Sequence, residues 1–283
     1  MIVVTGATGH LGRLVIAALL KKVPASGIVA AVRNRDKARD LAALGVNVRY
    51  ADYTQPATWD DTLKGADNVL LISSSEIGQR AKQHRSVIDA ARRAGVKLLA
   101  YTSVLRADSS PLGLAVEHKE TESLIRASGV PFALLRNSWY TENYTAGIAG
   151  VLAQGAVYGC AGEGRVASAA RVDYAEAAAY VLTADSQAGR VYELAGDTAF
   201  TLKELAAEIS RQSGKNIGYV NLPEAEYKSV LIKAGLPEPV AALLSDSDTG
   251  ISKGGLFDDG HQLSKLIGRT TTSLAAAVAV AMK

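Results

Sequence analysis

The sequence has little cysteine and little aromatic content. Its 283 residues contain a single cysteine, Cys160, and only 6% are Phe, Trp or Tyr. One cysteine excludes an intrachain disulfide and a cysteine-rich metal site, and it fits a reducing, cytoplasmic setting. The four histidines are scattered, without the HExxH spacing typical of a zinc hydrolase, so we expect no metal.

Strong charge bias and long apolar runs are also missing. The net charge is +3, and Lys and Arg are interspersed with Asp and Glu, so no basic stripe predicts nucleic-acid binding. The first residues lack the basic and apolar regions of a signal peptide, and the alanine-rich segment 270–283 is too short to cross a bilayer. We expect a cytoplasmic monomer or homodimer that acts on a small molecule and not on a membrane.

Two familiar catalytic signatures are absent as well. No GxSxG sequence is present, which excludes the nucleophile elbow of a serine hydrolase. None of the 11 tyrosines has a lysine four residues later, so the Tyr–Lys acid of many ketone reductases is missing. A substrate whose reduced anion is already stable, such as a quinone, tolerates this deficit.

Short β-branched runs alternate with longer amphipathic stretches over the first half of the chain. Strands separated by helices of this length form βαβ units with right-handed crossovers. We expect strands at 2–5, 28–32, 46–50, 68–72, 98–102 and 132–135, and helices at 11–22, 35–44, 59–64, 79–94 and 117–127. The sequence therefore predicts an α/β fold, a Rossmann-like doubly wound parallel sheet.

The pattern changes after residue 136. An aromatic and polar stretch and a glycine-rich loop, GCAGEGR, precede a strand at 191–194 and helices at 202–212, 224–234 and 239–244. Thr201 and Glu204 have the spacing of a capping box at the first of these helices. We expect residues 1–136 to form the Rossmann-like domain, and residues 137–283 to form a smaller, mostly helical lobe with some segments returning to the sheet.

Three glycines follow the first strand in TGATGHLG, at positions 6, 9 and 12. A glycine-rich turn between a buried strand and a helix exposes backbone N–H groups to which a pyrophosphate can bind. The glycine nearest the helix lets the helix pack closely against the strand. A tight turn without a ligand is the alternative. The position at the first βα turn favours dinucleotide binding.

The residue after the second strand selects between the two nicotinamide dinucleotides. An NAD site places Asp or Glu there to bind the ribose 2′-hydroxyl, whereas a 2′-phosphate needs a cation. Arg33 occupies this position, with Arg35 nearby. A guanidinium binds phosphate with forked hydrogen bonds, so NADP(H) is favoured for residues 1–136. The alternative is that Arg33 is a solvated residue at the strand end.

Polar residues also follow the third and fourth strands. Asp52 is in a position to face an adenine amino group, although an ordinary loop aspartate has the same sequence context. Ser73, Ser74 and Ser75 lie where a cofactor crosses the carboxyl edge of a sheet, or they form an ordinary turn.

Candidates for acceptor binding lie further along. His118 is near the start of a predicted helix, where catalysis and simple surface exposure are both open. Trp139, Tyr140 and Tyr144 form either a flat slot for a quinone or ordinary core packing. The side chains of Asn137 and Asn143 are the polar groups that we expect near a nicotinamide or a quinone oxygen.

Several longer segments carry a family resemblance. They are TGATGHLG, ISSSEIGQRAKQH, AYTSVLRADSSPLGLAVEH, LLRNSWYTENY, YELAGD and ISKGGLFDD. Together they resemble the NmrA-like branch of the atypical short-chain dehydrogenases/reductases, nearly end to end. The resemblance implies an oxidoreductase that binds NADPH and reduces a quinone in the cleft between the two lobes, with triphenylmethane reductases as near relatives.

The patterns and the resemblance together give the expected site. The candidate catalytic residues are Asn143, Tyr140 and His118. The candidate cofactor-binding residues are Gly6, Ala7, Thr8, Gly9, His10, Leu11, Gly12, Arg33, Ser73, Ser74, Ser75, Thr102, Asn137, Ser138, Trp139 and Tyr140.

Three functions remain open at this point. The first is an NADPH:quinone oxidoreductase that transfers hydride directly to a small quinone. The second is an NADP(H)-binding redox sensor without turnover. The third is a reductase of dyes and other conjugated acceptors. The aromatic segment after the sixth strand favours the first.

Overall fold

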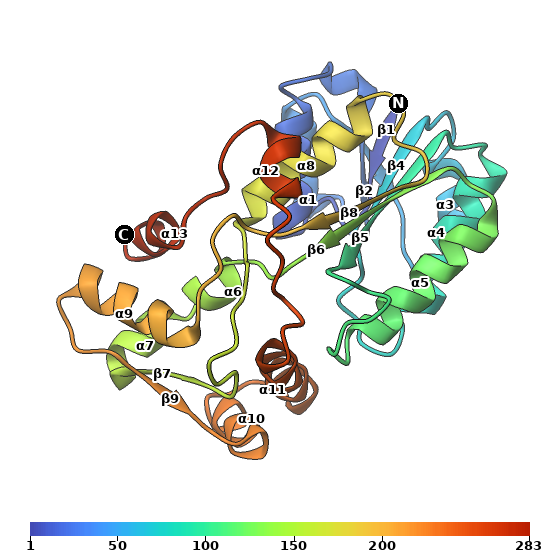
Figure 1. The fold of residues 1–283 in the computed structure, drawn as a ribbon. Coiled ribbons are helices and arrows are strands. Elements are labelled where there is room, and N and C mark those ends of the chain that lie inside the picture. Colours follow the sequence, from blue (N-terminus) through green and yellow to red (C-terminus); the bar gives the residue numbers. More distant parts are fainter. The chain divides into compact units, whose positions relative to one another are not determined.

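The structure is a computed structural model that describes all 283 residues. Seven strands form the main sheet, in the order β3-β2-β1-β4-β5-β6-β8 (Figure 1). The strands are β1 (Ile2–Val4), β2 (Ile28–Val32), β3 (Asn47–Tyr50), β4 (Asn68–Leu71), β5 (Leu98–Val104), β6 (Phe132–Asn137) and β8 (Arg190–Leu194). The predicted Rossmann-like α/β fold is confirmed.

Strand β1 is the topological centre of the sheet. It pairs in parallel with β2 on one side and β4 on the other, with Ile2 opposite both Ile28 and Asn68. All residues of β1 and β2 are buried, as expected for strands covered on both faces. Strand order reverses at β1, and ligands of such sheets bind at the carboxyl edge beside this point.

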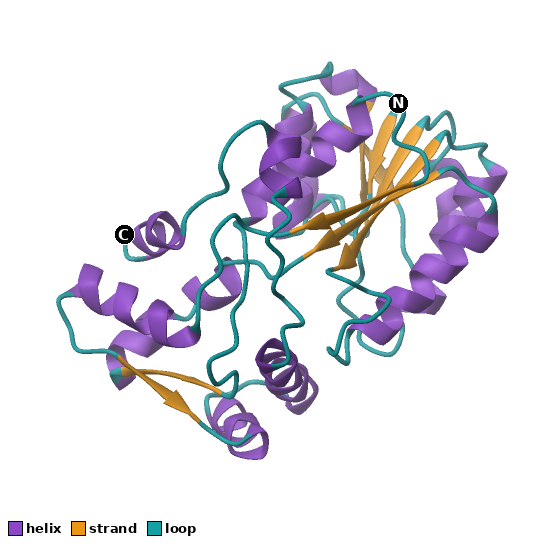
Figure 2. Cartoon of the chain, viewed as in Figure 1, coloured by secondary structure: helices purple, strands orange, loops and turns teal.

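Helices cover both faces of the sheet (Figures 1 and 2). On one face α1 (His10–Leu19) packs along α8 (Arg171–Thr183), and on the other lie α3 (Ala57–Thr62), α4 (Arg80–Arg93) and α5 (Ala115–Ser128). Helix α1 buries Leu11, Val15, Ile16 and Leu19, which form one face at helical spacing. The predicted helix at 35–44 is divided into a 3₁₀ turn (Asp36–Ala38) and α2 (Arg39–Ala43), and a second 3₁₀ turn spans Ala25–Gly27.

The chain divides into two compact units. Unit 1 comprises Met1–Val104, Glu117–Asn137 and Arg171–Tyr192, and unit 2 comprises Leu105–Val116, Ser138–Ala170 and Glu193–Lys283. The expected division after residue 136 lies one residue before the passage from Asn137 in unit 1 to Ser138 in unit 2. Two further segments depart from a single division of the chain: residues 105–116 belong to unit 2, and residues 171–192 belong to unit 1.

Unit 2 consists mostly of helices. They are α6 (Glu142–Thr145), α7 (Ile148–Gln154), α9 (Leu202–Ser213), α10 (Glu224–Lys233), α11 (Glu238–Ser252), α12 (Gln262–Ile267) and α13 (Leu274–Ala281). Strands β7 (Ala156–Gly159) and β9 (Gly218–Asn221) pair in parallel. The predicted capping box of α9 is confirmed, since the Thr201 side chain accepts a hydrogen bond from the Glu204 N–H and the Glu204 carboxylate accepts one from the Thr201 N–H.

Several elements of the second half carry no clear sequence signal. Helix α8 exposes the apolar Val172 and Tyr180 and buries Asp173, so its sequence lacks an amphipathic period. The predicted helix 239–244 extends to Ser252. None of the helices combines the length and the apolar character that crossing a membrane requires.

Candidate functional site

The loop between β1 and α1 has the geometry of an anion-binding turn. Gly6 has a φ of +57°, which favours glycine, and its carbonyl accepts a hydrogen bond from the Gly9 N–H at 2.9 Å. Gly9 precedes the first residue of α1 with extended backbone and no side-chain cap. The first N–H groups of α1 therefore face outward without a side chain to bind them.

Gly12 is required by close packing. A Cβ atom at this position would overlap the Gly6 carbonyl oxygen and lie 2.8 Å from the Ala7 Cα. Ala7 and Leu11 are buried core residues, whereas Thr8 is half-buried and Gly9 and His10 are exposed. The loop thus presents mainly backbone to a ligand, and the residues present fit a dinucleotide pyrophosphate.

Arg33 is the first residue after β2, which is the position expected for a 2′-phosphate ligand. Its side chain is 70% exposed, and its Nη1 lies 3.6 Å from Glu76 Oε1 on the segment that follows β4. Strands β2 and β4 flank β1, so both side chains stand at the carboxyl edge beside the glycine loop. The structure brings together these two predicted elements, the loop and the guanidinium.

Asp52 has a local structural role. Its Oδ1 accepts hydrogen bonds from the N–H and hydroxyl of Thr54, both at 2.8 Å, which form a turn after β3. The neighbouring Tyr53 hydroxyl donates to Thr5 Oγ1 at 2.9 Å, and burial raises its pKa to about 12. These bonds support the ordinary-turn interpretation of Asp52.

The serine cluster after β4 is anchored to its neighbours. The Ser73 N–H donates to Thr102 Oγ1 at 2.8 Å, and the Ser74 N–H donates to His84 Nε2 at 2.9 Å. Ser74 is buried, whereas Ser75 is exposed. Ser73, Ser74 and Thr102 therefore shape the carboxyl edge at β4 and β5, and Ser75 is open to a ligand.

His118 is buried, not on the surface. It is 4% exposed, and its Nδ1 lies 2.8 Å from the Tyr101 hydroxyl. Burial, reinforced by the Arg80 guanidinium, lowers the pKa of His118 to about 3. The ring is therefore neutral at physiological pH, and the alternative interpretation of His118 as a surface residue is wrong.

A buried polar network that the sequence analysis missed lies beside His118. His84 accepts from Ser74 through Nε2, so its Nδ1 carries the proton and faces Thr121 Oγ1 at 2.9 Å. Burial, again reinforced by Arg80, lowers the pKa of His84 to about 3. The signal was the spacing of Arg80 and His84 with apolar Val87 and Ile88, which places both polar residues on the buried face of α4.

Asn137 ends β6 at the same carboxyl edge. Its side-chain Oδ1 is buried without a hydrogen-bond partner, which is an open acceptor at the place where a cofactor amide is expected. Ser138 is the first residue of the second segment of unit 2, and its hydroxyl donates to the Leu256 carbonyl at 3.2 Å.

The aromatic segment is divided between packing and a cavity. Trp139 packs against the apolar core of unit 2, and Tyr140 forms a strand-like bridge with Ala169. Tyr144 packs edge-to-face on Phe200, with ring centroids 5.8 Å apart. These contacts support core packing for Trp139, whereas the bridge of Tyr140 is a backbone contact. Tyr144 also lines a cavity.

That cavity, of about 530 Å³, lies within unit 2. Asn143 is one of its lining residues, together with apolar side chains from α9 and α10, including Ile209, Val230 and Leu231. Residues of α7 and β7 also line it. Tyr227 also contributes, and burial raises the pKa of its hydroxyl. A cavity with apolar walls and few polar groups suits a flat, uncharged ligand.

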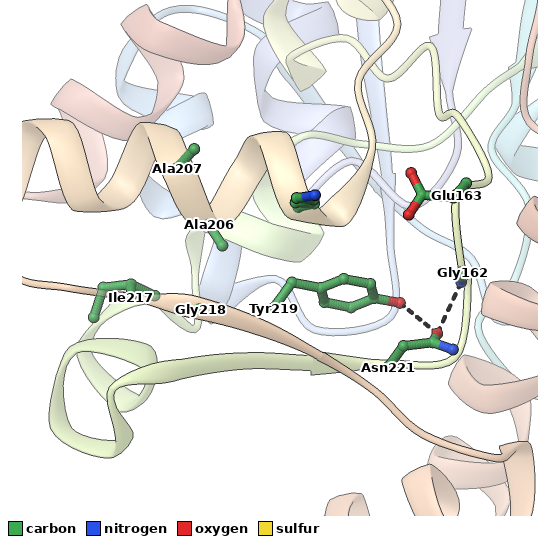
Figure 3. A pocket seen from close by; sticks show the side chains of 9 residues that line it. Gly162, Glu163, Ala206, Ala207, Ile217, Gly218, Tyr219 and Asn221 are labelled. Carbon is green, nitrogen blue, oxygen red and sulfur yellow. Dashed lines mark hydrogen bonds between the residues drawn. The ribbon is translucent and has the colours of Figure 1, made fainter.

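A second hollow of unit 2, of about 650 Å³, lies between α9 and β9 (Figure 3). Tyr219 extends along it, and Asn221 Oδ1 accepts from the Tyr219 hydroxyl at 2.8 Å and from the Gly162 N–H at 2.9 Å. Glu163 points toward it from the glycine-rich loop. None of the predicted site residues lines this hollow.

The glycine loop, the guanidinium after β2 and the topological switch at β1 define a Rossmann-like dinucleotide-binding protein. The model of the NmrA-like family matches residues 1–276, and the chain belongs to this family. The family resemblance expected from the sequence is therefore confirmed.

Individual relatives are similar over nearly the whole chain. Quinone oxidoreductase 2 of Escherichia coli strain K12 is 57% identical over 98% of this chain and 97% of its own length. The crystal structure of the E. coli NADPH-dependent quinone oxidoreductase complexed with NADPH matches with a TM-score of 0.98, 56% identity and full coverage of both chains. Citrobacter sp. triphenylmethane reductase complexed with NADP(H) matches with a TM-score of 0.95 and 41% identity, over 99% of this chain and 100% of its own.

Proposed function

We propose that this protein is an NADPH-dependent oxidoreductase that transfers hydride directly to a small quinone. The observation that carries the proposal is the glycine loop with Arg33 after β2, in a chain that matches an NADPH-dependent quinone oxidoreductase over its full length. The single cysteine fits a cytoplasmic site of action.

Unit 1 supplies the groups that would hold the cofactor. The outward backbone N–H groups at the start of α1 bind the pyrophosphate, and Arg33 binds the 2′-phosphate. Ser75 and the open Asn137 acceptor are placed along the carboxyl edge for the rest of the molecule. Bound there, NADPH supplies the hydride.

In this proposal the quinone lies against the nicotinamide, because direct hydride transfer requires contact between the two reacting groups. The Asn143 amide is the group that we propose to hydrogen-bond a quinone oxygen. Tyr140 and His118 remain candidates for contact with the reacting groups. Because the pKa of His118 lies near 3, its role is that of a neutral hydrogen-bond donor and not of a charged acid.

This arrangement suits an acceptor that needs no strong acid. Hydride transfer to a quinone yields a hydroquinone anion, which is stabilised by aromatic delocalisation and takes its proton from water. Alignment of the two reactants then carries most of the catalysis. An ordinary ketone would yield an unstabilised alkoxide, so we expect simple ketones to be poor substrates.

Reduction of conjugated dyes is the second candidate. The match to triphenylmethane reductase favours it, since both reactions need only an exposed nicotinamide and a pocket for a flat acceptor. Cationic dyes lack the carbonyl oxygen to which Asn143 would donate. Comparison of the two acceptors therefore separates the candidates.

The experiment is a steady-state assay with purified protein. We expect loss of NADPH absorbance on addition of a small quinone, with NADH a poorer donor and a triphenylmethane dye a slower acceptor. Absence of quinone-dependent NADPH oxidation overturns the proposal. Tight NADPH binding without turnover on any acceptor would instead identify a redox sensor.

A further inference from the structure

The ion pair between Arg33 and Glu76 crosses the carboxyl end of β1. Arg33 follows β2 and Glu76 lies on the segment after β4, and these strands are the two neighbours of β1. The charged atoms are 3.6 Å apart. The side chains therefore meet beside the glycine loop, where the phosphates of a dinucleotide would lie.

The two partners are held very differently. Glu76 Oε2 accepts a hydrogen bond from the Gln83 Nε2 at 2.7 Å, and Gln83 is buried. Gln83 in turn accepts from the Ser74 hydroxyl, whose oxygen accepts from the Glu76 N–H at 3.2 Å. Arg33 makes only the ion pair and is 70% exposed. The carboxylate is thus anchored, and the guanidinium is free to move.

The segment that carries Glu76 is fixed from behind as well. Glu117 Oε1 accepts from the Gly78 N–H at 2.9 Å and from the Arg80 N–H at 3.3 Å. The Arg80 Nε donates to the Ser74 carbonyl at 2.6 Å. These bonds tie both ends of the turn to α4 and α5, so the carboxylate keeps its place whether or not Arg33 is near.

We propose that Glu76 is a built-in competitor of the 2′-phosphate for Arg33 and thereby limits how tightly the protein holds NADPH. The inference rests on the proposed NADPH specificity. A guanidinium that engages the phosphate must leave Glu76, so the attraction within the ion pair is subtracted from the free energy of nucleotide binding. The exposed pair is weak enough to open when the phosphate arrives.

The competition has a consequence for turnover. When the oxidised nucleotide leaves, Glu76 recaptures Arg33, so the 2′-phosphate is released more readily than from an unopposed arginine. NADH carries no 2′-phosphate, so Arg33 does not have to leave Glu76 when NADH binds. Glu76 therefore lowers the affinity for NADPH and leaves the affinity for NADH unchanged.

The test is Glu76→Gln, which removes the charge but keeps an oxygen that can accept from Gln83. In titrations without quinone, we expect NADPH and adenosine 2′,5′-bisphosphate to bind about threefold to fivefold more tightly, and NADH to change by less than about twofold. The gain shrinks at high salt. It disappears in an Arg33→Ala background, where no guanidinium remains to be released.

Asp60→Asn is the matched control, since Asp60 is an exposed carboxylate paired with Arg93 on the outer helices. It changes the net charge equally and should leave nucleotide binding unchanged. The proposal is overturned if Glu76→Gln leaves NADPH affinity unchanged or weakens it, shifts NADH equally, or keeps its gain after Arg33→Ala. These titrations contain no acceptor, so a failure of quinone reduction leaves their outcome intact, and the reverse also holds.

Discussion

The carboxyl edge of unit 1 and the cavity of unit 2 are built on opposite principles. At the edge, backbone groups and short side chains are tied by hydrogen bonds from one element to the next, as in the bonds from Ser73 to Thr102 and from Ser74 to His84. In the cavity, apolar side chains such as Ile209 and Leu231 form the walls. Fixed polar geometry selects one cofactor, whereas apolar walls accept flat molecules of several shapes.

Burial acts on charge in the same way in both regions. It lowers the pKa of His84 and His118 to about 3 in unit 1, and it raises the pKa of Asp248 to about 6 in unit 2. Neutral forms are favoured in each case. The two regions therefore differ in hydrogen bonding and shape, and not in how burial affects their ionisable groups.

The largest expected effect comes from the loop that defines the edge. Gly12→Val places side-chain atoms on the Gly6 carbonyl and the Ala7 backbone, so α1 must move away from β1. We expect a loss of NADPH affinity of more than about 100-fold, because the outward N–H groups are displaced. Titration by nucleotide fluorescence measures it. Gly27→Ala, where a Cβ meets nothing within 4 Å, is the control and should bind normally.

The next effect is expected at Arg33, which should change the affinity for NADPH and not the affinity for NADH. Arg33→Ala removes the charge-assisted bonds to the 2′-phosphate, so we expect NADPH to bind weaker by about 1.5–3 kcal/mol. NADH affinity should stay nearly unchanged. Equal weakening of both nucleotides in parallel titrations would show that Arg33 is not a 2′-phosphate ligand.

The edge was more predictable from sequence than the cavity. The glycine loop and Arg33 follow from residues adjacent to strand ends, so local spacing places them correctly. The cavity assembles Asn143, Val157 and Leu231, which are far apart in the chain, and no local period marks such a set. Helix α8 was missed for another reason, since it exposes the apolar Val172 and Tyr180 and buries Asp173, which hides its amphipathic period.

The buried polar network of His84 and His118 was predicted only in part from the sequence. The pattern of α4 places His84 on its buried face, but the partner of that ring, Thr121, lies on α5 and is known only from the fold. His118 was a catalytic candidate with surface exposure as the alternative, and its burial against Tyr101 depends on how α5 packs on β5. The sequence therefore places each histidine on its helix, whereas its environment depends on how the helices pack.

An intermediate effect is expected in the cavity. Asn143→Ala removes the amide proposed to contact a quinone oxygen, so we expect the quinone kcat/KM to fall about tenfold. NADPH affinity should remain unchanged, since the proposal assigns Asn143 to the quinone and not to the cofactor. Ser229→Ala, an exposed position on the neighbouring α10, is the control. A fall for both nucleotide binding and quinone turnover would place Asn143 in the cofactor site.

The last expected effect concerns stability and tests the network directly. The pKa of His118 is about 3 in the folded protein and near 6.5 in the unfolded chain, so only the unfolded chain takes up a proton as the pH falls below 6.5. The neutral, buried ring thus stabilises the fold fully above pH 6.5, and this contribution is lost progressively at lower pH. Each histidine of this kind contributes a slope of about 1.4 kcal/mol per pH unit.

The measurement is urea unfolding of His118→Gln and the wild-type protein between about pH 6.5 and pH 4.5. Asp248, with its raised pKa, opposes the trend in both proteins, so the difference between them isolates His118. We expect the free energy of unfolding of the variant to fall less steeply as the pH falls, with a slope smaller by about 1.4 kcal/mol per pH unit. The exposed His10→Gln is the control and should follow the wild-type slope. Parallel slopes for His118→Gln would show that the ring is accessible to protons in the folded protein.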